Sequence, residues 1–281
     1  MAINLAEKYE KKVQERFALS SRTDAYVGKD YEFTGVKTIK IYSVDTVPMV
    51  DYTRSGTSRF GSLTELADSL QELTVEKDRG FTFSIDAGNA AEQFNIKQAN
   101  ASLKRQIDEV ITPEIDKYRF ASWAAGKGLS EGKSILTAVD GALDKDTFIE
   151  AVLTGGAKMS DEMVPNANRV IFIPELTYVK FRLSDVMQGG SDTLTAENIR
   201  KGYRGELDGM HIVTVPTSLF PSGVNFIIKY KGATVDPVKL RNYRIHKNPM
   251  GVDGDVVEGR VIYDSFVLDS KAKGIFVSKT A

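Results

Sequence analysis

The chain of 281 residues has no cysteine, two histidines and one tryptophan. The absence of cysteine excludes disulfide bonds, thiolate zinc sites and a cysteine nucleophile. No apolar run approaches the roughly 18 residues that a membrane-spanning helix needs. The stretch from Met1 to Arg16 is polar and mixed in charge, unlike a signal peptide. We therefore expect a protein that folds in a reducing cytoplasm and has no membrane partner.

The sequence also lacks an excess of either charge. Lysine and arginine together number 37, and aspartate and glutamate number 38, which gives a net charge of −1. Proteins dedicated to nucleic-acid binding usually carry a clear basic excess. The composition argues against that class, although it leaves room for a local basic face.

Motifs for catalysis, cofactor binding and metal binding are missing as well. There is no G-x-S-x-G, no P-loop and no G-x-G-x-x-G after a strand, and no histidine and carboxylate cluster has metal-ligand spacing. We interpret His211 and His246 as structural residues in or near strands. Gly126-Lys127-Gly128 is typical of a helix end, and 251–255 of a turn, because it lacks the full ligand series of a calcium loop. The sequence thus predicts no enzyme, no cofactor and no metal.

The most informative segment that is present is an extended β-ribbon. Val36–Val44 is predicted to be a strand, Thr46–Ala67 a long polar tip, and Leu70–Ile85 a returning strand with a bulge or bend at Asp78-Arg79-Gly80. A two-stranded ribbon with a long tip cannot bury both faces within its own chain, and alone it is marginal in water. This pattern favours an assembly protein over an enzyme.

A long amphipathic helix is predicted directly after the ribbon. Ala90–Ile111 has apolar residues at helical spacing and would span about 33 Å. Thr112-Pro113 predicts a break or kink, after which Glu114–Ala125 continues in helical register. The apolar stripe consists of Phe94, Ala99, Leu103, Ile107 and Val110.

Helices and strands alternate in the next region, which indicates a mixed α/β arrangement. Beyond Val235 the chain is rich in predicted strands. Near the beginning, Ile3–Phe17 carries an apolar residue at every fourth position, which fits either a docked surface helix or an arm packed on a neighbouring subunit. The α/β region contains predicted helices at Asp146–Met159 and Glu175–Leu183, strands at Arg169–Ile173, His211–Val215 and Val224–Tyr230, and a polar stretch at Ser184–Tyr203.

The order of these segments resembles the major capsid protein of tailed bacteriophages, which has the Hong Kong 97-like capsid fold. That order is a helical arm, a long ribbon, a long helix, an α/β region and a strand-rich return. The resemblance covers nearly the whole chain, and order and spacing carry it more than any single string. The most similar strings are Val110–Tyr118, Arg169–Glu175, Gly205–Val213, Gly259–Val267 and Lys271–Ile275.

The resemblance implies an α+β fold in five parts. Residues 1–30 would form an N-terminal arm, and 31–84 an extended β-ribbon loop that reaches over a neighbour. Residues 85–133 would form a peripheral domain with the spine helix, and 134–231 an axial α/β domain. The C-terminal strands in 232–281 would return to the peripheral domain.

The same resemblance implies self-assembly into hexamers and pentamers of an icosahedral shell, the virion capsid. This shell would enclose double-stranded phage DNA and would be assembled in the host bacterial cytoplasm. Expected partners are a portal and a decoration protein. The residues before the ribbon are too few for a cleaved scaffolding segment, so the resemblance implies a separate scaffolding protein, or none. We find no lysine, asparagine and carboxylate trio to place, so we expect no covalent crosslink.

Two other hypotheses stay open. One is an encapsulin-type nanocompartment, which shares the fold but encloses protein cargo. The other is a soluble α/β enzyme that uses the ribbon for dimerisation. A small stable oligomer with a deep polar pocket would favour the enzyme.

The ribbon tip holds the candidates for contacts between subunits. Arginine and aromatic residues are enriched at interface anchors. We therefore expect Tyr52, Arg54, Arg59 and Phe60 to touch an adjacent subunit. The alternative is a solvent loop that contains arginine by chance.

The polar face of the long helix holds the candidates for DNA contact. Lys97, Lys104 and Arg105 lie on this face and could bind phosphates without sequence specificity. The alternative is an ordinary solvated helix face.

Overall fold

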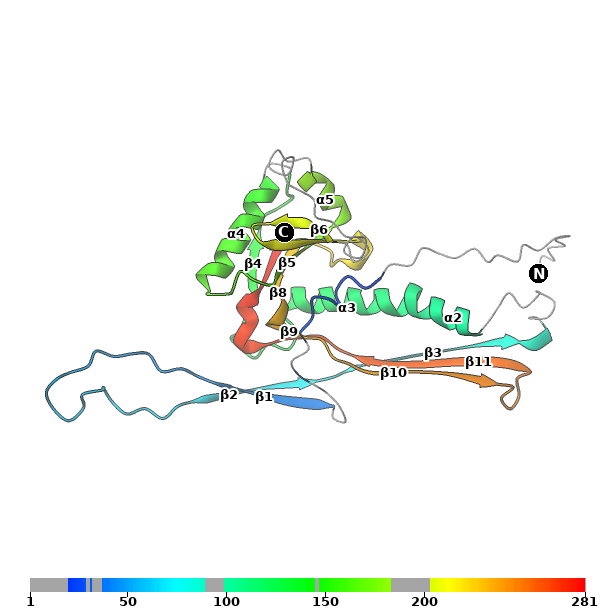
Figure 1. Ribbon diagram of the computed structural model, residues 1–281, viewed down its shortest axis with the longest axis horizontal. Coiled ribbons are helices and arrows are strands. Elements are labelled where there is room, and N and C mark those ends of the chain that lie inside the picture. Colours follow the sequence, from blue (N-terminus) through cyan, green and yellow to red (C-terminus); the bar gives the residue numbers. More distant parts are fainter. Residues whose placement is uncertain are drawn as a thin grey trace.

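The computed structural model describes residues 20–28, 31, 37–88, 99–144, 147–182 and 203–280. A body of helices and strands stands on a long, thin layer of β-structure that reaches beyond the body on both sides (Figure 1). This mixture of helices and largely antiparallel sheets confirms the predicted α+β class. The predicted helix at Ile3–Phe17 and nearly all of the polar stretch Ser184–Tyr203 lie outside the described residues.

A six-stranded sheet forms the centre of the body. Its order is β4-β13-β8-β5-β7-β6, with β4 parallel to β13, β5 parallel to β7, and the other pairs antiparallel. The central strand β5 is buried at every residue, as its continuous apolar sequence requires. The elements of the body are β4 (Leu136–Val139), α4 (Thr147–Asp161), β5 (Arg169–Pro174), α5 (Glu175–Arg182), β6 (Tyr203–Leu207), β7 (Met210–Val215), β8 (Val224–Tyr230) and β13 (Ile275–Lys279).

The long helix continues through the expected break. Pro113 lies in the first turn of α3, directly after a π-helical turn in which the Thr112 N–H donates to the Ile107 carbonyl. Of the break or kink predicted at Thr112-Pro113, the break is absent, and a π-helical turn lies directly before the proline. The helix ends at Gly126 in the left-handed conformation (φ 66°), as the glycine signal predicts. Its parts are α2 (Ala99–Gln106), the π-turn η1 (Ile107–Ile111) and α3 (Thr112–Ala125).

Each face of the six-stranded sheet has its own core. On one face α4 and α5 cover the strands, and Phe148 packs edge-on against Phe226. On the other face α3 inserts Trp123, which is fully buried. On the first face α4 comes so close to β13 that a Cβ on Gly155 would lie 2.7 Å from a ring carbon of Phe276. This close approach explains a glycine in the middle of a helix.

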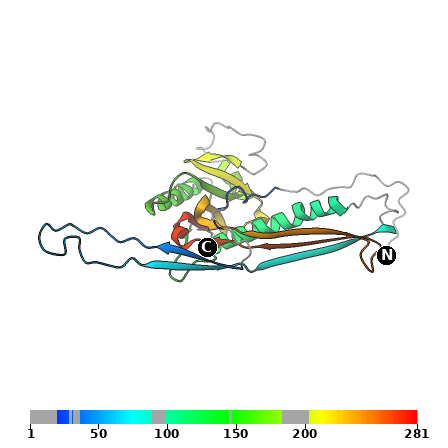
Figure 2. The same cartoon turned by 60° about the horizontal axis from the view of Figure 1, so that its bottom comes forward.

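The β-layer below the body consists of two separate small sheets. The hairpin β1-β2 projects from one side of the body, and the three-stranded sheet β10-β11-β3 projects from the other (Figures 1 and 2). All the pairings are antiparallel, with Thr38 opposite Thr74 at the root of the hairpin. The strands are β1 (Thr38–Val44), β2 (Asp68–Thr74), β3 (Lys77–Asp86), β10 (Val238–Lys247) and β11 (Gly254–Tyr263).

The predicted returning strand Leu70–Ile85 is thus two strands in two sheets. The chain changes sheet at Val75 and Glu76, where the Glu76 N–H donates to the buried Asp264 carboxylate instead of a ladder carbonyl. Of the bulge or bend expected at Asp78-Arg79-Gly80, the bulge is absent, because these residues pair with β11 in unbroken register. The register irregularity of this sheet lies in β10 instead, between Val238 and Leu240.

The end of the chain divides between the two layers. β10 and β11 run beside β3, as expected for strands that return to the ribbon and the long helix. The last strand does not return: β13 lies between β4 and β8 in the body, so the expectation for 232–281 is wrong there. The remaining short elements are η3 (Thr217–Leu219), η4 (Lys231–Ala233), β9 (Thr234–Val235), β12 (Phe266–Val267) and η5 (Asp269–Gly274).

Candidate assembly surface

The ribbon tip, residues 45–67, is closed by its own backbone. The Asp45 N–H donates to the Ala67 carbonyl just beyond the hairpin, and the Thr53 N–H donates to the Arg59 carbonyl 3.0 Å away near the end. Arg59 Nε donates to the Gly56 carbonyl at 3.1 Å, and Gly56 has a φ of 90° that favours glycine. The tip is therefore a defined turn that is held by hydrogen bonds within the ribbon itself.

The tip carries exposed apolar side chains among its polar residues, which the expectation of a polar tip did not include. More than half of the large exposed hydrophobic side chains of the described residues lie between Tyr42 and Leu70. Met49 is 98% exposed and Phe60 is 82% exposed. Single exposed apolar side chains are normal, but a concentration in one projecting element marks an interaction surface. The other members are Val44, Val47, Val50, Tyr52, Leu63 and Leu66.

The four predicted contact residues lie together at this tip. The rings of Tyr52 and Phe60 meet edge to face, with centroids 5.0 Å apart. Arg54 and Arg59 are exposed, and within the described residues neither of them pairs with a carboxylate. Since the turn already uses Arg59 Nε, Arg54 is the cation with more freedom to meet a partner. The contact with a neighbouring subunit stays a prediction.

The root of the ribbon, in contrast, is fixed to the body by a buried amide. Gln71 is 6% exposed, and its Nε2 donates to the carbonyls of Gly128 and Val267, both at 2.8 Å. Its Oε1 accepts from the Asp269 N–H at 3.1 Å. Leu73 lies on the same strand face and belongs to a small core with Val75, Val235, Phe266 and Leu268. The ribbon therefore projects from a rigid base.

A buried carboxylate joins the ribbon, the long helix and the last strands. Asp264 is 1% exposed, and Lys127 Nζ and the Tyr118 hydroxyl each donate to its Oδ1, at 2.7 and 2.8 Å. Burial alone would lower the pKa of Lys127, but its hydrogen bonds to Asp264 and Tyr118 outweigh burial and raise it. Burial raises the pKa of Tyr118. Asp264 therefore holds Lys127 charged at this junction.

Neither Gln71 nor Asp264 stands out in the sequence as an anchor. The sequence did contain a signal for Gln71. Gln71, Leu73 and Val75 stand at every second position and therefore share one face of the strand, and the last two are apolar, so this face is predicted to be buried. No local pattern marks Asp264, since its partners come from segments distant in the chain.

The segment before the ribbon is clasped by charged residues of α3. Asp116 accepts from the Ser21 hydroxyl at 2.8 Å and from the Arg22 N–H at 2.7 Å. Arg119 is buried and donates to Asp24 and to the Thr23 hydroxyl. Residues 20–28 are thereby fixed to the helix.

A buried lysine from β8 holds the same segment. Lys229 is 1% exposed, its Nζ donates to the Tyr26 carbonyl at 2.7 Å, and it lies 4.4 Å from the centre of the Trp123 ring. Burial lowers the pKa of Lys229 to about 8, and the nearby Asp236 opposes this shift. The charge of Lys229 is therefore sensitive to pH near the physiological range.

Two of the three predicted DNA-facing residues lie in the part of the chain that the structure describes. Lys104 on α2 is exposed, Arg105 is half-buried, and Lys97 lies outside the described residues. No residue of α2 is buried. Contact with DNA stays a prediction.

The described part of the chain shows no constellation for catalysis or metal binding. It contains no group of three or more histidine, aspartate or glutamate residues placed to hold a metal. His211 pairs with Glu206 at 3.0 Å and His246 with Glu258 at 3.3 Å, each on a strand. Among the same residues, no helix is both long and apolar enough for a transmembrane span.

Solved structures match nearly the whole chain, whereas no family model and no curated protein matches the sequence. The capsid structure of the cyanophage P-SCSP1u is 14% identical, with a TM-score of 0.69 over 99% of this chain and 93% of that one. The capsid of the Myoviridae phage XM1 is 10% identical, with a TM-score of 0.69 over 100% and 99%. A virus-like particle from Pyrococcus furiosus is 10% identical, with a TM-score of 0.53 over 86% of each chain.

These matches define the class of the fold, which is that of capsid proteins. More particularly, the chain has the Hong Kong 97-like capsid fold of tailed phages, as the order of its segments predicted. Sequence identities this low establish the architecture alone.

Proposed function

We propose that this protein is the major capsid protein of a tailed bacteriophage. Its copies assemble into hexamers and pentamers of an icosahedral shell that encloses double-stranded DNA. The observation that carries this proposal is the ribbon, which is fixed at its root by Gln71 and exposes apolar side chains such as Met49 and Phe60 at its tip. The likeness of the whole chain to phage capsid structures supports the same reading.

The physics of shell assembly suits this shape. A closed shell forms when the same heterologous contact repeats with a rotation that closes. A projecting ribbon can lie across the next copy and bury area without a deep pocket, and a stable contact needs on the order of 1,500 Å². Each contact can be weak, because several neighbours hold each copy at once.

The other partners follow from the same proposal. Packaged DNA would meet exposed cations such as Lys104 through salt-dependent phosphate contacts. A portal, a scaffolding protein and a decoration protein would act on the assembling or finished shell. These partners are tested by co-purification with the shell from infected cells.

The decisive experiment is electron microscopy of the purified protein after velocity sedimentation. We expect closed shells tens of nanometres across, and DNA inside the shells taken from virions. A uniform dimer or tetramer under all conditions, including co-expression with the neighbouring genes, would contradict the proposal and favour the enzyme hypothesis.

One observation keeps the nanocompartment as a second candidate. The fold is also similar to that of a virus-like particle from Pyrococcus furiosus, although at a TM-score of 0.53 against 0.69 for the phage capsids. The contents of the shells separate the two functions. Protein cargo without nucleic acid would favour the nanocompartment.

A further inference from the structure

Lys229 stands at a position of the six-stranded sheet where its neighbours are apolar. It follows Ile227 by two residues on β8, so both side chains point to the face that α3 covers. Its partners in register are Val170 on β5 and Ile275 on β13, and both of them are buried. Lys229 itself is only 1% exposed. Because a buried charge is costly, a lysine in this position needs an explanation.

The ammonium group of Lys229 has few partners. A charged lysine carries three N–H donors. Among the described residues, the acceptor within reach is the Tyr26 carbonyl, 2.7 Å from Nζ, and the Trp123 ring lies below with its centre 4.4 Å away. In the same part of the chain no carboxylate forms an ion pair with Lys229. The charge is therefore only partly compensated while residues 20–28 are in place.

The nearby carboxylate of Asp236 favours the charge but does not offset burial. Its two oxygens already accept from the Trp123 ring N–H and from the hydroxyls of Thr234 and Ser265. Burial lowers the pKa of Lys229 to about 8. The charged and titratable groups on the elements packed around Lys229 are Asp116 and Arg119 of α3, Lys231 of η4, Asp236 after β9, and Asp24 and Tyr26 of residues 20–28.

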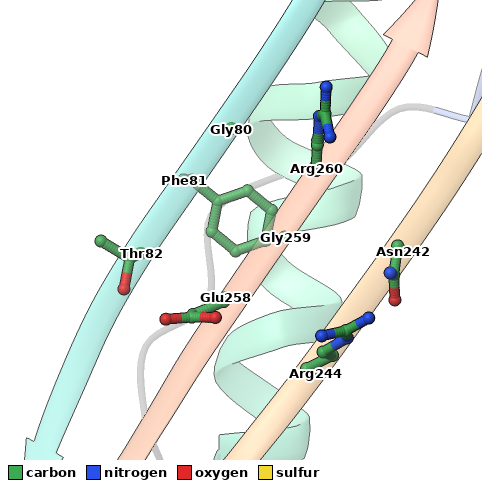
Figure 3. A pocket seen from close by; sticks show the side chains of 8 residues that line it. All are labelled: Gly80, Phe81, Thr82, Asn242, Arg244, Glu258, Gly259 and Arg260. Atoms are coloured by element: carbon green, nitrogen blue, oxygen red, sulfur yellow. The ribbon is translucent and has the colours of Figure 1, made fainter.

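An exposed cation of the same chain shows the opposite arrangement. Arg260 on β11 lies at an open hollow of about 500 Å³ across β3, β11 and β10 (Figure 3). It donates to both carboxylate oxygens of Asp78, and these hydrogen bonds raise the pKa of Arg260. Its charge thus has both a carboxylate partner and water. Lys229 has neither as long as residues 20–28 cover it.

Residues 20–28 are attached in a way that allows local opening. They belong to no helix or strand, and Gly28 alone forms a β-bridge, to β9. Side chains of α3 hold most of the segment, through Asp116 and Arg119. An open hollow of about 430 Å³ beside the segment leaves one side of it unpacked. Segments with few backbone hydrogen bonds open at a lower free energy than the central strands of a sheet.

We infer that residues 20–28 form a proton-linked clasp, which closes over Lys229 and is held less firmly when this lysine carries its charge. Opening the clasp removes the Tyr26 carbonyl and lets water reach Nζ, so the open form takes up a proton that the closed form releases. The clasp lies within one chain, so the inference does not depend on the proposed shell function. In an assembly it would make the attachment of the residues before the ribbon dependent on pH.

The direction of the pH dependence follows from the two forms of the clasp. The pKa of Lys229 is about 8 in the closed form, and in the open form it approaches the ordinary value of 10.5. Between these values the open form holds more protons, so a rise in pH favours the closed clasp. Burial raises the pKa of Tyr26, which places its titration above this range. From pH 7 to pH 9 the equilibrium constant for opening should fall about tenfold, and from pH 6 to pH 7 it should hardly change.

Amide hydrogen exchange followed by mass spectrometry measures this equilibrium. The full-length wild type is labelled at pH 6, 7, 8 and 9, and each exchange rate is divided by the intrinsic rate at the same pH. Protection of residues 20–28 should rise about tenfold between pH 7 and pH 9. Strand β5, at the centre of the sheet, is the internal reference for opening of the whole fold.

Two lysine variants identify the titrating group. Lys229→Met keeps an unbranched side chain and removes the charge, so the protection of residues 20–28 should lose its pH dependence. Lys231→Met is the matched control, because Lys231 lies two residues further along the chain and is exposed. This control should keep the tenfold change.

Each possible result decides the inference. A wild-type profile that stays flat from pH 7 to pH 9 would overturn it, and so would an unchanged slope in Lys229→Met. Parallel changes in residues 20–28 and in β5 would also overturn it, because the segment would then open only with the whole fold. If Lys229→Met does not fold, the wild-type profile measured against β5 decides alone. None of these results bears on the shell function, which sedimentation and electron microscopy test separately.

Discussion

Two regions of this molecule exchange the usual places of polar and apolar groups. Around the ribbon root and residues 20–28, the charged side chains of Asp264, Arg119 and Lys229 are buried and hydrogen-bonded. At the ribbon tip, Met49 and Phe60 are exposed. Buried charges are retained only when they have partners, and exposed apolar groups are costly unless something covers them. The contrast indicates that the chain completes the first region itself and leaves the second to another molecule.

The largest loss of stability is expected at the centre of the buried region. Asp264→Ala removes the acceptor for Lys127 and Tyr118 and for the Glu76 and Ser265 N–H groups. Lys127 keeps Glu76 as a second partner at 3.5 Å, so the cost comes mainly from the donors left without an acceptor, about 1–3 kcal/mol for each buried one. Urea unfolding followed by circular dichroism measures this loss.

An exposed carboxylate is the matched control for Asp264. Asp78 also pairs with a cation, Arg260, but both side chains are solvated. Asp78→Ala should change the unfolding free energy little, because surface pairs contribute little. Equal losses at the two positions would show that burial is not what distinguishes the two regions.

The second-largest effect depends on pH at Lys229. Its pKa is about 8 in the folded chain, lowered first by burial and also by Arg119 and Lys231, against 10.5 as the ordinary value, while Asp236 opposes the shift. Between pH 8 and 10.5 the unfolded chain therefore holds a proton that the folded chain has released, so this group adds stability as the pH rises. Over the whole window the gain is on the order of 3 kcal/mol.

The substitution Lys229→Met isolates this group. The difference in unfolding free energy between the wild type and the variant should move in favour of the wild type from pH 7.5 to pH 9.5. Most of this change should disappear below pH 7, where Lys229 is charged in both states. Parallel pH profiles for the two proteins would contradict the buried, shifted lysine.

The fold could be predicted from the sequence where a pattern is local and repeated. The apolar run Arg169–Ile173 gave a buried strand, and the glycines at 126 and 128 marked the end of the long helix. Pro113 predicted an irregularity but not its form, which is a π-turn before the proline and no break in the helix. The split at Val75 and Glu76 and the position of β13 depend on pairing with distant strands, which no local pattern encodes.

The candidate surface could be predicted only in part for the same reason. The aromatic and arginine residues of the tip stood out by type. The exposed apolar side chains of the tip could not be predicted, because Met49, Val50 and Leu63 are scattered among polar residues in the sequence. They are exposed because the ribbon projects away from the body. Nothing in the local sequence distinguishes Asp116 and Asp264 from surface carboxylates, although both are buried in the fold.

A smaller loss is expected at the ribbon root. Gln71→Ala leaves the carbonyls of Gly128 and Val267 and the Asp269 N–H without their partner. Leaving buried polar groups unsatisfied costs about 1–3 kcal/mol. Ser69→Ala is the control, since its hydroxyl is exposed and reaches the Ser43 carbonyl only at 3.5 Å. Hydrogen exchange should rise along β1 and β2 in the Gln71 variant alone.

The smallest effect on stability is expected at the tip, where the effect on assembly is expected to be large. Tyr52 and Phe60 contact each other but not the body, so Tyr52→Ser with Phe60→Ser should change the unfolding free energy of the subunit by less than about 0.5 kcal/mol. The same variant loses the aromatic anchors of the proposed contact and should form few or no shells. Met163→Ser provides the control, because Met163 is 91% exposed after α4 and lies outside the ribbon. A tip variant that unfolds more easily would mean that the tip belongs to the folding unit, and one that assembles normally would mean that its exposed rings have no partner.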